Sequence, residues 1–361
     1  MRLSKEELEQ IKNEYGVDNI WSWSRVSSWY TSKYEWFLRY ILHTTPDRTD
    51  CIYGQEGSYS HDIIEKFYNH EIQYEDMINE FNDGWNMSRD ILGLKFNRND
   101  NTKDESIAER YYENLKYFFE RHVPLKYDIH TENFVIIKIG NNILQGYIDA
   151  WYKDENDEYH IIDWKSSSIY TDKVLLEKSG QLMCYAMAFN QKGIPLEKIH
   201  LHFNFLKYCT ITYEQVNGKI KSMNVERRLL GEKLQNPCKI WLKNFGYNID
   251  EYLPKVLDSM DIECLPTEVR EKISISDCYV NVPCTMEQVE YWQSYVNQTI
   301  NEIDSAILDY EVFGNEDAFY DSIEDVKKES FYYATLSEYS SILNPCYARY
   351  LNGLENALDI S

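Results

Sequence analysis

The sequence predicts an α/β fold, because the spacing of its apolar residues changes along the chain between the periods of helix and strand. Before residue 122, apolar and aromatic residues recur every three to four positions, as in half-buried helices. Between residues 134 and 164 they form short β-branched and aromatic runs separated by turn residues. Helical spacing returns at residue 174, and strand-like runs follow from residue 199.

Composition indicates a globular chain that is large enough for one elaborated domain or two domains. Of the 361 residues, 43% are hydrophobic, 27% are charged and only 22 are glycine or proline. These values exclude collagen-like and mainly disordered chains. The formal net charge is −23, opposite to that of a protein that coats nucleic acid with a broad basic face. Any contact with nucleic acid is therefore expected to be local or assisted by metal ions.

The cellular setting predicted from the sequence is a reducing cytoplasm without membrane insertion. Eight cysteines are scattered without a CxxC pair, which indicates neither a zinc ribbon nor a disulfide framework. The first sixteen residues are charged and helix-like, without the apolar region of a secretion signal, and no stretch approaches 18 uncharged apolar residues.

The amino-terminal half is expected to begin with helices and to continue into a β-meander. Ser4 and Glu7 have capping-box spacing, so a first helix opens there and ends near Gly16. The remaining elements expected from periodicity are helices over 24–42, 57–68 and 107–122, then strands over 134–137, 143–151 and 159–164.

The carboxyl-terminal half is expected to add one more helix, further strands and a mainly helical end. We expect a helix over 174–190, a strand over 199–207 and a hairpin of 208–216 with 219–225, joined by a type I′ turn at Asn217-Gly218. Thr285 and Gln288 resemble a capping box that opens a helix to about Leu308.

The strongest chemical signal lies in the second and third strands of the meander. Asp149 ends a Gly-Tyr-Ile-Asp run, and Asp163 follows fourteen residues later as Asp-Trp-Lys. If these strands pair, both carboxylates reach one hard divalent ion such as Mg²⁺ or Mn²⁺. Lys165 shares a strand face with Asp163 and could orient or help deprotonate an attacking water beside that ion. Alone, such a triplet more often lines a solvated strand face.

Two helical pairs add weaker signals. His61 and Glu65 lie one turn apart in the helix of 57–68, where a neutral imidazole could complete the metal site. For an isolated histidine, a surface pair with Glu65 is the commoner outcome. Gln181 and Tyr185 are also one turn apart and could donate hydrogen bonds to a phosphate or hold the lysine.

The order and spacing of these motifs resemble the PD-(D/E)xK nuclease superfamily. GxxxHxxxE on a helix precedes Glu132 with Phe134 at a strand start, then GxxD, DxK and QxxxY. Within the superfamily the chain is similar to the RecB-type and Cas4-like exonuclease branch over about residues 22–207. The resemblance implies a restriction-endonuclease-like core of mixed β-sheet flanked by helices. We therefore expect three regions: an amino-terminal helix in 1–21, the nuclease core in 22–226, and a largely helical elaboration packed on the core in 227–361.

The resemblance also implies roles for individual residues. The metal ligands would be His61, Asp149, Asp163 and the Trp164 carbonyl, and Lys165 would be the catalytic lysine. Gln181 and Tyr185 would support the site and the nucleic-acid backbone, Glu132 would lie at its edge, and Glu65 would have at most a supporting role.

One departure from the family concerns iron. Many relatives hold an iron–sulfur cluster through one cysteine in the early helix and three near the carboxyl terminus. Here the early stretch 30–34 contains no cysteine, and only Cys346 stands near the end. A four-thiolate cluster would need distant cysteines, so we expect none.

The function expected from this resemblance is a Mg²⁺- or Mn²⁺-dependent DNA exonuclease or DNA-end processor. The expected substrate is single-stranded DNA or DNA with free ends, and a recombination or replication protein is the expected partner. The resemblance also suggests a phage-encoded protein, which would act in the host cytoplasm. The alternatives are a structure-selective endonuclease, an RNA-processing nuclease, or a non-catalytic adaptor built on a nuclease fold.

Overall fold

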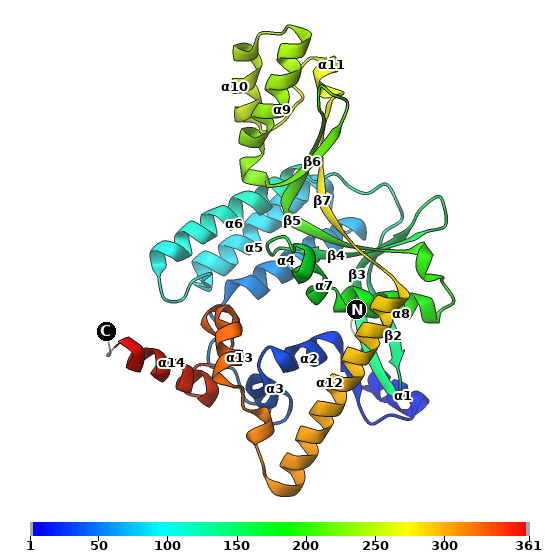
Figure 1. The fold of residues 1–361 in the computed structure, drawn as a ribbon, viewed down its shortest axis with the longest axis vertical. Coiled ribbons are helices and arrows are strands. Elements are labelled where there is room, and N and C mark those ends of the chain that lie inside the picture. Colours follow the sequence, from blue (N-terminus) through cyan, green and yellow to red (C-terminus); the bar gives the residue numbers. More distant parts are fainter. Residues whose placement is uncertain (1–2, 359–361) are drawn as a thin grey trace.

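The computed structural model describes residues 3–358, with side chains as far as residue 354. In this part of the chain, seven strands form one sheet in the order β1-β3-β4-β5-β6, with β2 added on β3 and β7 on β5 (Figure 1). The pairs β1–β3 and β4–β5 are parallel and the others antiparallel, so the expected mixed sheet is confirmed. The strands are β1 (Ile20–Ser22), β2 (His130–Ile139), β3 (Asn142–Lys153), β4 (Tyr159–Lys165), β5 (Ile199–Glu214), β6 (Ile220–Glu226) and β7 (Ile273–Val282).

Helices flank this sheet, and several of them cover its two faces. They are α1 (Lys5–Tyr15), α2 (Trp23–Ser27), α3 (Lys33–Tyr40), α4 (Ile52–Tyr68), α5 (Met77–Asn86), α6 (Asn101–Arg121), α7 (Asp172–Lys178), α8 (Gly180–Gln191), α9 (Leu230–Phe245), α10 (Ile249–Ser259), α11 (Thr267–Arg270), α12 (Met286–Phe313), α13 (Ile323–Lys328) and α14 (Pro345–Leu358). The predicted start of α1 is confirmed, because Ser4 and Glu7 form a reciprocal capping box and Gly16 ends the helix in the left-handed conformation.

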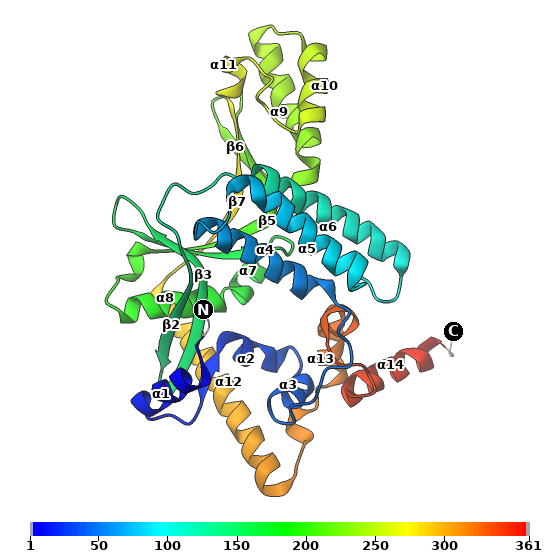
Figure 2. The same ribbon diagram turned by 180° about the vertical axis from the view of Figure 1, so that it is seen from behind.

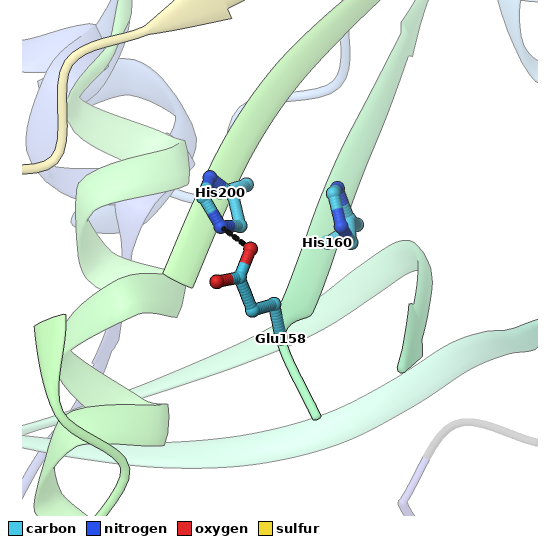
Figure 3. Close-up of side chains that lie close together, drawn as sticks. All are labelled: Glu158, His160 and His200. Atoms are coloured by element: carbon cyan, nitrogen blue, oxygen red, sulfur yellow. Dashed lines mark hydrogen bonds and ion pairs between the residues drawn. The ribbon is translucent and has the colours of Figure 1, made fainter. Parts of the chain in front are cut away.

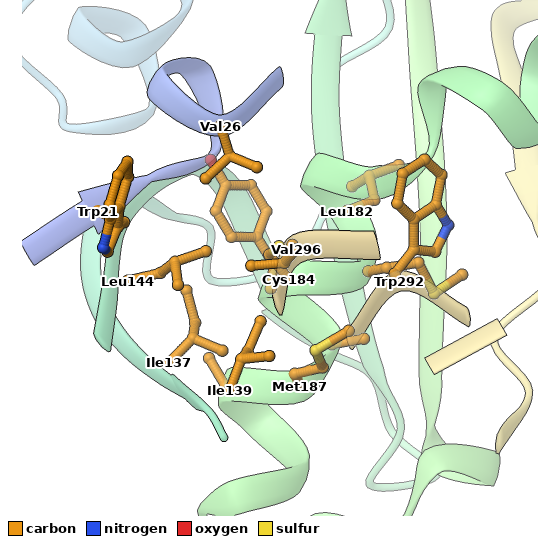
Figure 4. Packing of buried hydrophobic residues seen from close by; sticks show 14 of the residues in the cluster. Trp21, Val26, Ile137, Ile139, Leu144, Leu182, Cys184, Met187, Trp292 and Val296 are labelled. Atoms are coloured by element: carbon orange, nitrogen blue, oxygen red, sulfur yellow. The ribbon is translucent and has the colours of Figure 1, made fainter. Parts of the chain in front are cut away.

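Two separate hydrophobic cores lie on the two faces of the sheet. Neighbouring strand residues point to opposite sides, and accordingly Ile161 joins one core while Ile162 joins the other. The Ile161 side packs against α2, α3, α8 and α12, with Trp292 and Val296 prominent in Figure 4. The Ile162 side packs against α4, α5 and α6, which lie side by side in Figures 1 and 2. Strand β4 therefore runs between two packed layers.

The helix expected over residues 24–42 is interrupted, and the expectation of one continuous helix is wrong. The chain forms α2, a 3₁₀ turn at Ser28–Tyr30 and then α3. Ser32 has an extended backbone, and its hydroxyl accepts a hydrogen bond from the Glu35 backbone N–H, which starts α3 anew. A serine cap inside a periodic apolar pattern is easily overlooked, because the periodicity on both sides remains helical.

The helix expected over residues 174–190 is also divided, into α7 and α8. The two helices meet at Ser179 and Gly180, where the Trp23 ring occupies the space of a side chain. A Cβ on Gly180 would lie 2.0 Å from a carbon of that ring. The close approach explains the glycine and places Trp23 over the amino-terminal end of α8.

The region expected as a strand and a separate hairpin is built around one long strand. Residues 199–207 and 208–214 are continuous in β5, which pairs antiparallel with β6. The hairpin is confirmed, but the type I′ turn is wrong because only Gly218, with φ of 80°, has a positive φ at the tip. The Gln215 carbonyl accepts from the Gly218 N–H, as in a type I turn followed by one left-handed residue.

The region after Arg227 is mainly helical, but it returns one strand to the sheet. β7 pairs with β5, which was not expected from the sequence. The capping box at Thr285 is half confirmed: the Thr285 hydroxyl accepts a hydrogen bond from the Gln288 N–H, but no reciprocal bond from the Gln288 side chain accompanies it. The helix that it caps, α12, continues to Phe313, beyond the expected end at about Leu308. Helices α9, α10 and α11 form a third core on the far end of β5, β6 and β7 and project from the sheet in Figure 1. Among residues 3–358 we find no helix long and apolar enough to cross a membrane.

Candidate active site

The site is assembled where β3 and β4 leave their pairing and α4 crosses them. Ala150 pairs with Ile162, so the next residues along the ladder are Asp149 and Asp163. The backbone pairing of β3 with β4 does not continue past this point. The Trp164 backbone N–H instead donates a hydrogen bond to the side chain of Asp149, at 3.1 Å from Oδ2. The structure thus brings together the two aspartates singled out from the sequence.

Asp163 is the most deeply buried acid of the site, with an exposed fraction of 1%. Lys165 Nζ lies 2.8 Å from its Oδ1 and 2.7 Å from its Oδ2, but only the contact to Oδ1 has hydrogen-bond geometry. Asp163 Oδ2 is consequently buried without a hydrogen-bond partner among the described residues. Burial lowers the pKa of Lys165, but the charges of Asp163 and Asp149 outweigh it and raise that pKa above its usual value. The lysine is therefore a cation beside an unsatisfied carboxylate oxygen.

Asp149 shares this buried space with Asp163. Burial, and then the charge of Asp163, raise the pKa of Asp149 well above its usual range. One lysine cannot neutralise two buried carboxylates, and Asp163 Oδ2 accepts no hydrogen bond among the described residues. The donor set therefore fits a hard divalent cation, which would supply the missing charge and contact.

His61 reaches the same point from α4. Its Nε2 lies 2.8 Å from the Trp164 carbonyl oxygen, and its Nδ1 lies 3.4 Å from Asp149 Oδ2. Since a carbonyl only accepts, Nε2 carries the proton and Nδ1 keeps its lone pair on the side of Asp149. Burial lowers the pKa of His61 to about 4, which keeps the ring neutral. The Trp164 carbonyl, the other expected ligand, is engaged by His61 in this arrangement.

Gln181 and Tyr185 form a short hydrogen-bonded chain on α8. Gln181 Nε2 donates to the Tyr185 hydroxyl at 2.9 Å, and that hydroxyl donates to the Tyr147 carbonyl of β3. Gly146 makes this packing possible, because a Cβ there would lie 2.8 Å from the Tyr185 ring. The glycine of the GxxD motif therefore has a steric role, because it lets α8 pack closely against β3. Burial raises the pKa of Tyr185 well above its usual value, so the hydroxyl remains a donor.

Glu132 lies at the edge of the site. Its neighbours Thr131 and Asn133 pair with Ala150 and Ile148, which places Glu132 opposite Asp149. Its φ of 45° is unusual for a residue with a side chain, and such strain is often found at functional sites. The negative charge of Glu132 also acts on Glu65 of α4. Burial is the larger cause and the charge of Glu132 the next, and both raise the pKa of Glu65.

A cavity of about 510 Å³ opens onto this arrangement. His61, Glu132, Asp149, Gln181 and Tyr185 line it, whereas Asp163 and Lys165 are not among its lining residues. The lining also includes residues that the sequence did not single out as site residues, namely Leu3 and Leu8 of the amino-terminal segment and Ser22, Trp23 and Ser24 at the start of α2. The only feature of the sequence that could have indicated the last three is the Ser-Trp-Ser run, which combines hydroxyl groups with an aromatic ring between two expected helices.

Comparison with known proteins agrees with this geometry. No curated protein matches the chain. The model of the PD-(D/E)XK nuclease superfamily matches residues 20–313, which is most of the chain and includes both the sheet and α12. The chain therefore belongs to the PD-(D/E)XK nuclease superfamily, which supports a metal-dependent nuclease in general.

Proposed function

We propose that the protein is a metal-dependent DNA exonuclease or DNA-end processor of the RecB-type and Cas4-like branch. The observation that carries the proposal is the convergence of Asp149, Asp163 and His61 beside the Lys165 ammonium. Recombination, repair or phage DNA metabolism in the cytoplasm would be its setting, with a recombination or replication protein as partner.

The site residues would have distinct tasks in phosphodiester hydrolysis. His61, Asp149 and Asp163 would hold Mg²⁺ or Mn²⁺, and two carboxylates with one neutral imidazole are compatible with either ion. A bound divalent ion supplies Lewis-acid stabilisation of the phosphate and makes a bound water more acidic. Lys165 would orient the attacking water and offset negative charge that develops on the phosphoryl oxygens. The Tyr185 hydroxyl and the Gln181 amide would position the backbone of the nucleic acid.

Preference for a single-stranded end is supported by the wall of the cavity. Trp23 lies there at an edge-to-face distance of 5.3 Å from Trp292, and an aromatic ring fixed in this way can stack on a base. Ser22 and Ser24 flank it with hydroxyl groups that can bond to phosphate. Stacking on an aromatic side chain suits the unpaired bases of a single strand.

The test compares cleavage of end-labelled linear DNA, circular single-stranded DNA and RNA in the presence of Mg²⁺ or Mn²⁺. We expect degradation of linear DNA from its ends, with circular DNA and RNA left intact. Cleavage of circular DNA would instead indicate an endonuclease, and cleavage of RNA would indicate an RNA-processing nuclease.

Variants separate catalysis from folding. Asp163→Ala and Lys165→Ala should abolish cleavage while the circular dichroism spectrum is retained. Matched controls are Asp128→Ala and Lys173→Ala, whose side chains are 96% and 90% exposed, and these should keep full activity. Full activity in a folded Asp163→Ala protein would overturn the proposal, and a folded wild type that cuts none of the substrates would favour the adaptor.

A further inference from the structure

A second group of ligand side chains lies at the start of β4 and β5, outside the site described above. Glu158 precedes β4, and His160 pairs with His200 of the parallel strand β5. One ligand atom from each residue can be chosen so that all lie within 4.8 Å of one another (Figure 3). His200 Nε2 and Glu158 Oε2 are already 2.7 Å apart. All three side chains are partly exposed, so an ion could enter from solvent.

Hydrogen bonds behind the cluster set the tautomer of His160. Asn281 Oδ1 lies 2.8 Å from His202 Nδ1, so this nitrogen carries the proton and donates it. The other nitrogen of neutral His202, Nε2, therefore accepts, and its partner at 3.0 Å is His160 Nδ1, which must donate. The remaining nitrogen of His160, Nε2, is left with a free lone pair. In metal sites, a hydrogen bond donated by one ring nitrogen in the same way fixes the tautomer, so that the other nitrogen can bind the metal.

The lone pair of His160 faces another carboxylate. Asp154 Oδ2 lies 3.6 Å from His160 Nε2, so two electron-rich atoms oppose each other unless a cation joins them. Asp154 also holds the turn before β4 in shape by accepting the backbone N–H groups of Asn156 and Glu158.

We propose that Glu158, His160 and His200 bind a divalent transition metal ion of the Zn²⁺ type, which fastens the start of β4 to the start of β5. Two imidazoles and one carboxylate form a common zinc ligand set, with ligand distances of about 2.0–2.2 Å. In this structure the His160 and His200 rings are stacked at 24°, with centroids 4.8 Å apart. Metal binding would shift the proton that His200 Nε2 donates to Glu158 to the other ring nitrogen, Nδ1. The two rings would turn apart so that both Nε2 lone pairs meet the ion, with Asp154 or water as a fourth ligand.

The proposed site is independent of the nuclease site. Asp163 follows His160 by three residues on β4, about 10 Å along the strand, and alternation places the two side chains on opposite faces. The ligand chemistry also differs, because imidazole-rich sites favour zinc-like ions over Mg²⁺. Either proposal could therefore fail without the other.

The test measures Zn²⁺ binding to the reduced full-length chain after treatment with a chelator. Zn²⁺ is titrated against a chromophoric chelator in the presence of millimolar Mg²⁺, which occupies the nuclease site. We expect one Zn²⁺ per chain, and we expect Glu158→Gln and His200→Ala each to weaken it by about 10- to 100-fold or more. Glu158→Gln preserves size and hydrogen bonding, so it keeps the test valid if His200→Ala does not fold.

Two controls locate the ion. His70→Asn removes an exposed imidazole elsewhere, and Asp163→Ala removes a nuclease-site acid, and both should retain the Zn²⁺. A second readout is thermal unfolding, in which Zn²⁺ should raise the midpoint of the wild type but not of Glu158→Gln. Absence of binding in the wild type, binding unchanged in both cluster variants, or loss in Asp163→Ala would each overturn the proposal.

Discussion

Asp149 and Asp163 are two carboxylates that the proposed metal site requires but whose burial together lowers the stability of the fold. Their carboxylates share a buried space that contains one lysine, and burial together with the charge of Asp163 raises the pKa of Asp149. In the absence of a divalent ion, keeping Asp149 ionised therefore costs folding free energy. Active sites are commonly places where such costs are tolerated.

Replacing Asp149 with asparagine should separate stability from function. Without metal, the free energy of unfolding at pH 7 should rise by about 1–2 kcal/mol, because one of two neighbouring buried charges is removed. The carbonyl of the introduced amide can still accept the Trp164 N–H, so the local fold should persist. Urea unfolding in the presence of a chelator measures the change.

The same variant should lose its response to metal. Mn²⁺ should raise the thermal midpoint of the wild type but leave that of Asp149→Asn nearly unchanged. Asp128→Asn, which changes a side chain that is 96% exposed, should behave as the wild type in both measurements. An Asp149→Asn protein less stable than the wild type in chelator would contradict this account of the site.

The residues of the candidate site could be named from the sequence, but most of the hydrogen bonds between them could not. The resemblance predicted His61, Asp149, Asp163 and Lys165 as site residues, and the structure brings these four side chains together. The contact of His61 with the Trp164 carbonyl and the unusual φ of Glu132 depend on how α4 is seated against the sheet. Packing of distant elements decides such details, and no local pattern records it.

Among the elements, two predictions failed because of contacts between distant parts of the chain. The division between α7 and α8 follows from Trp23, which is distant in sequence and fills the space beside Gly180. The strand β7 was missed because its partner β5 lies far earlier in the chain. By contrast, the meander of β2, β3 and β4 was predicted correctly, because adjacent strands joined by short turns need only local information.

A buried ion pair joins β7 to the rest of the molecule. The register of β5 with β7 shifts between Asn204 and Cys209, and there the Leu206 carbonyl accepts Arg227 Nε at 2.7 Å. Arg227 also pairs with Asp277 at 2.6 Å, and His122 Nδ1 lies 3.1 Å from the same carboxylate. Burial alone would raise the pKa of Asp277, but the charge of Arg227 lowers it below its usual value.

Removal of the Arg227 guanidinium should therefore lower the free energy of unfolding substantially. Arg227→Met should lower the free energy of unfolding by about 3–5 kcal/mol, since it leaves Asp277 buried without its counter-ion. The adjacent substitution Arg228→Met breaks a partly exposed pair with Glu226 and should cost about 1 kcal/mol or less. Urea unfolding of both variants at pH 7 makes the comparison.

The pH dependence gives a second check on the same pair. A carboxyl whose pKa is lowered by folding stabilises the protein above its unfolded pKa and loses that contribution as pH falls through the folded pKa. Without Arg227, burial should raise the pKa of Asp277, so the difference between wild type and Arg227→Met should begin to shrink as the pH falls through that raised pKa. The contribution of Asp277 to the difference should be lost once the pH lies below the lowered pKa of Asp277 in the wild type. Equal costs for Arg227→Met and Arg228→Met would refute the role given to the buried pair.

At the scale of the whole molecule, a chain of net charge −23 must bind a polyanion through few contacts. Several of its cations already lie beside carboxylates or aromatic rings. Lys165 pairs with Asp163, Arg39 with Glu338, and Lys173 with Glu177. The Arg25 guanidinium lies 4.4 Å from the centroid of the Trp21 ring, and its Nε is buried. These contacts reduce the positive charge that the residues named here can offer to DNA.

Binding of single-stranded DNA should consequently depend only weakly on salt. If about four phosphates or fewer are neutralised, the plot of log Kobs against log[KCl] should have a slope of about −3 or shallower. Fluorescence anisotropy of a labelled single strand measures this between about 50 and 200 mM KCl, the range over which such slopes separate extensive from limited contact. The Asp163→Ala variant with Ca²⁺ avoids cleavage during the titration. A slope of about −6 or steeper would mean that an extended basic surface forms on binding, because the charges described above could not produce it.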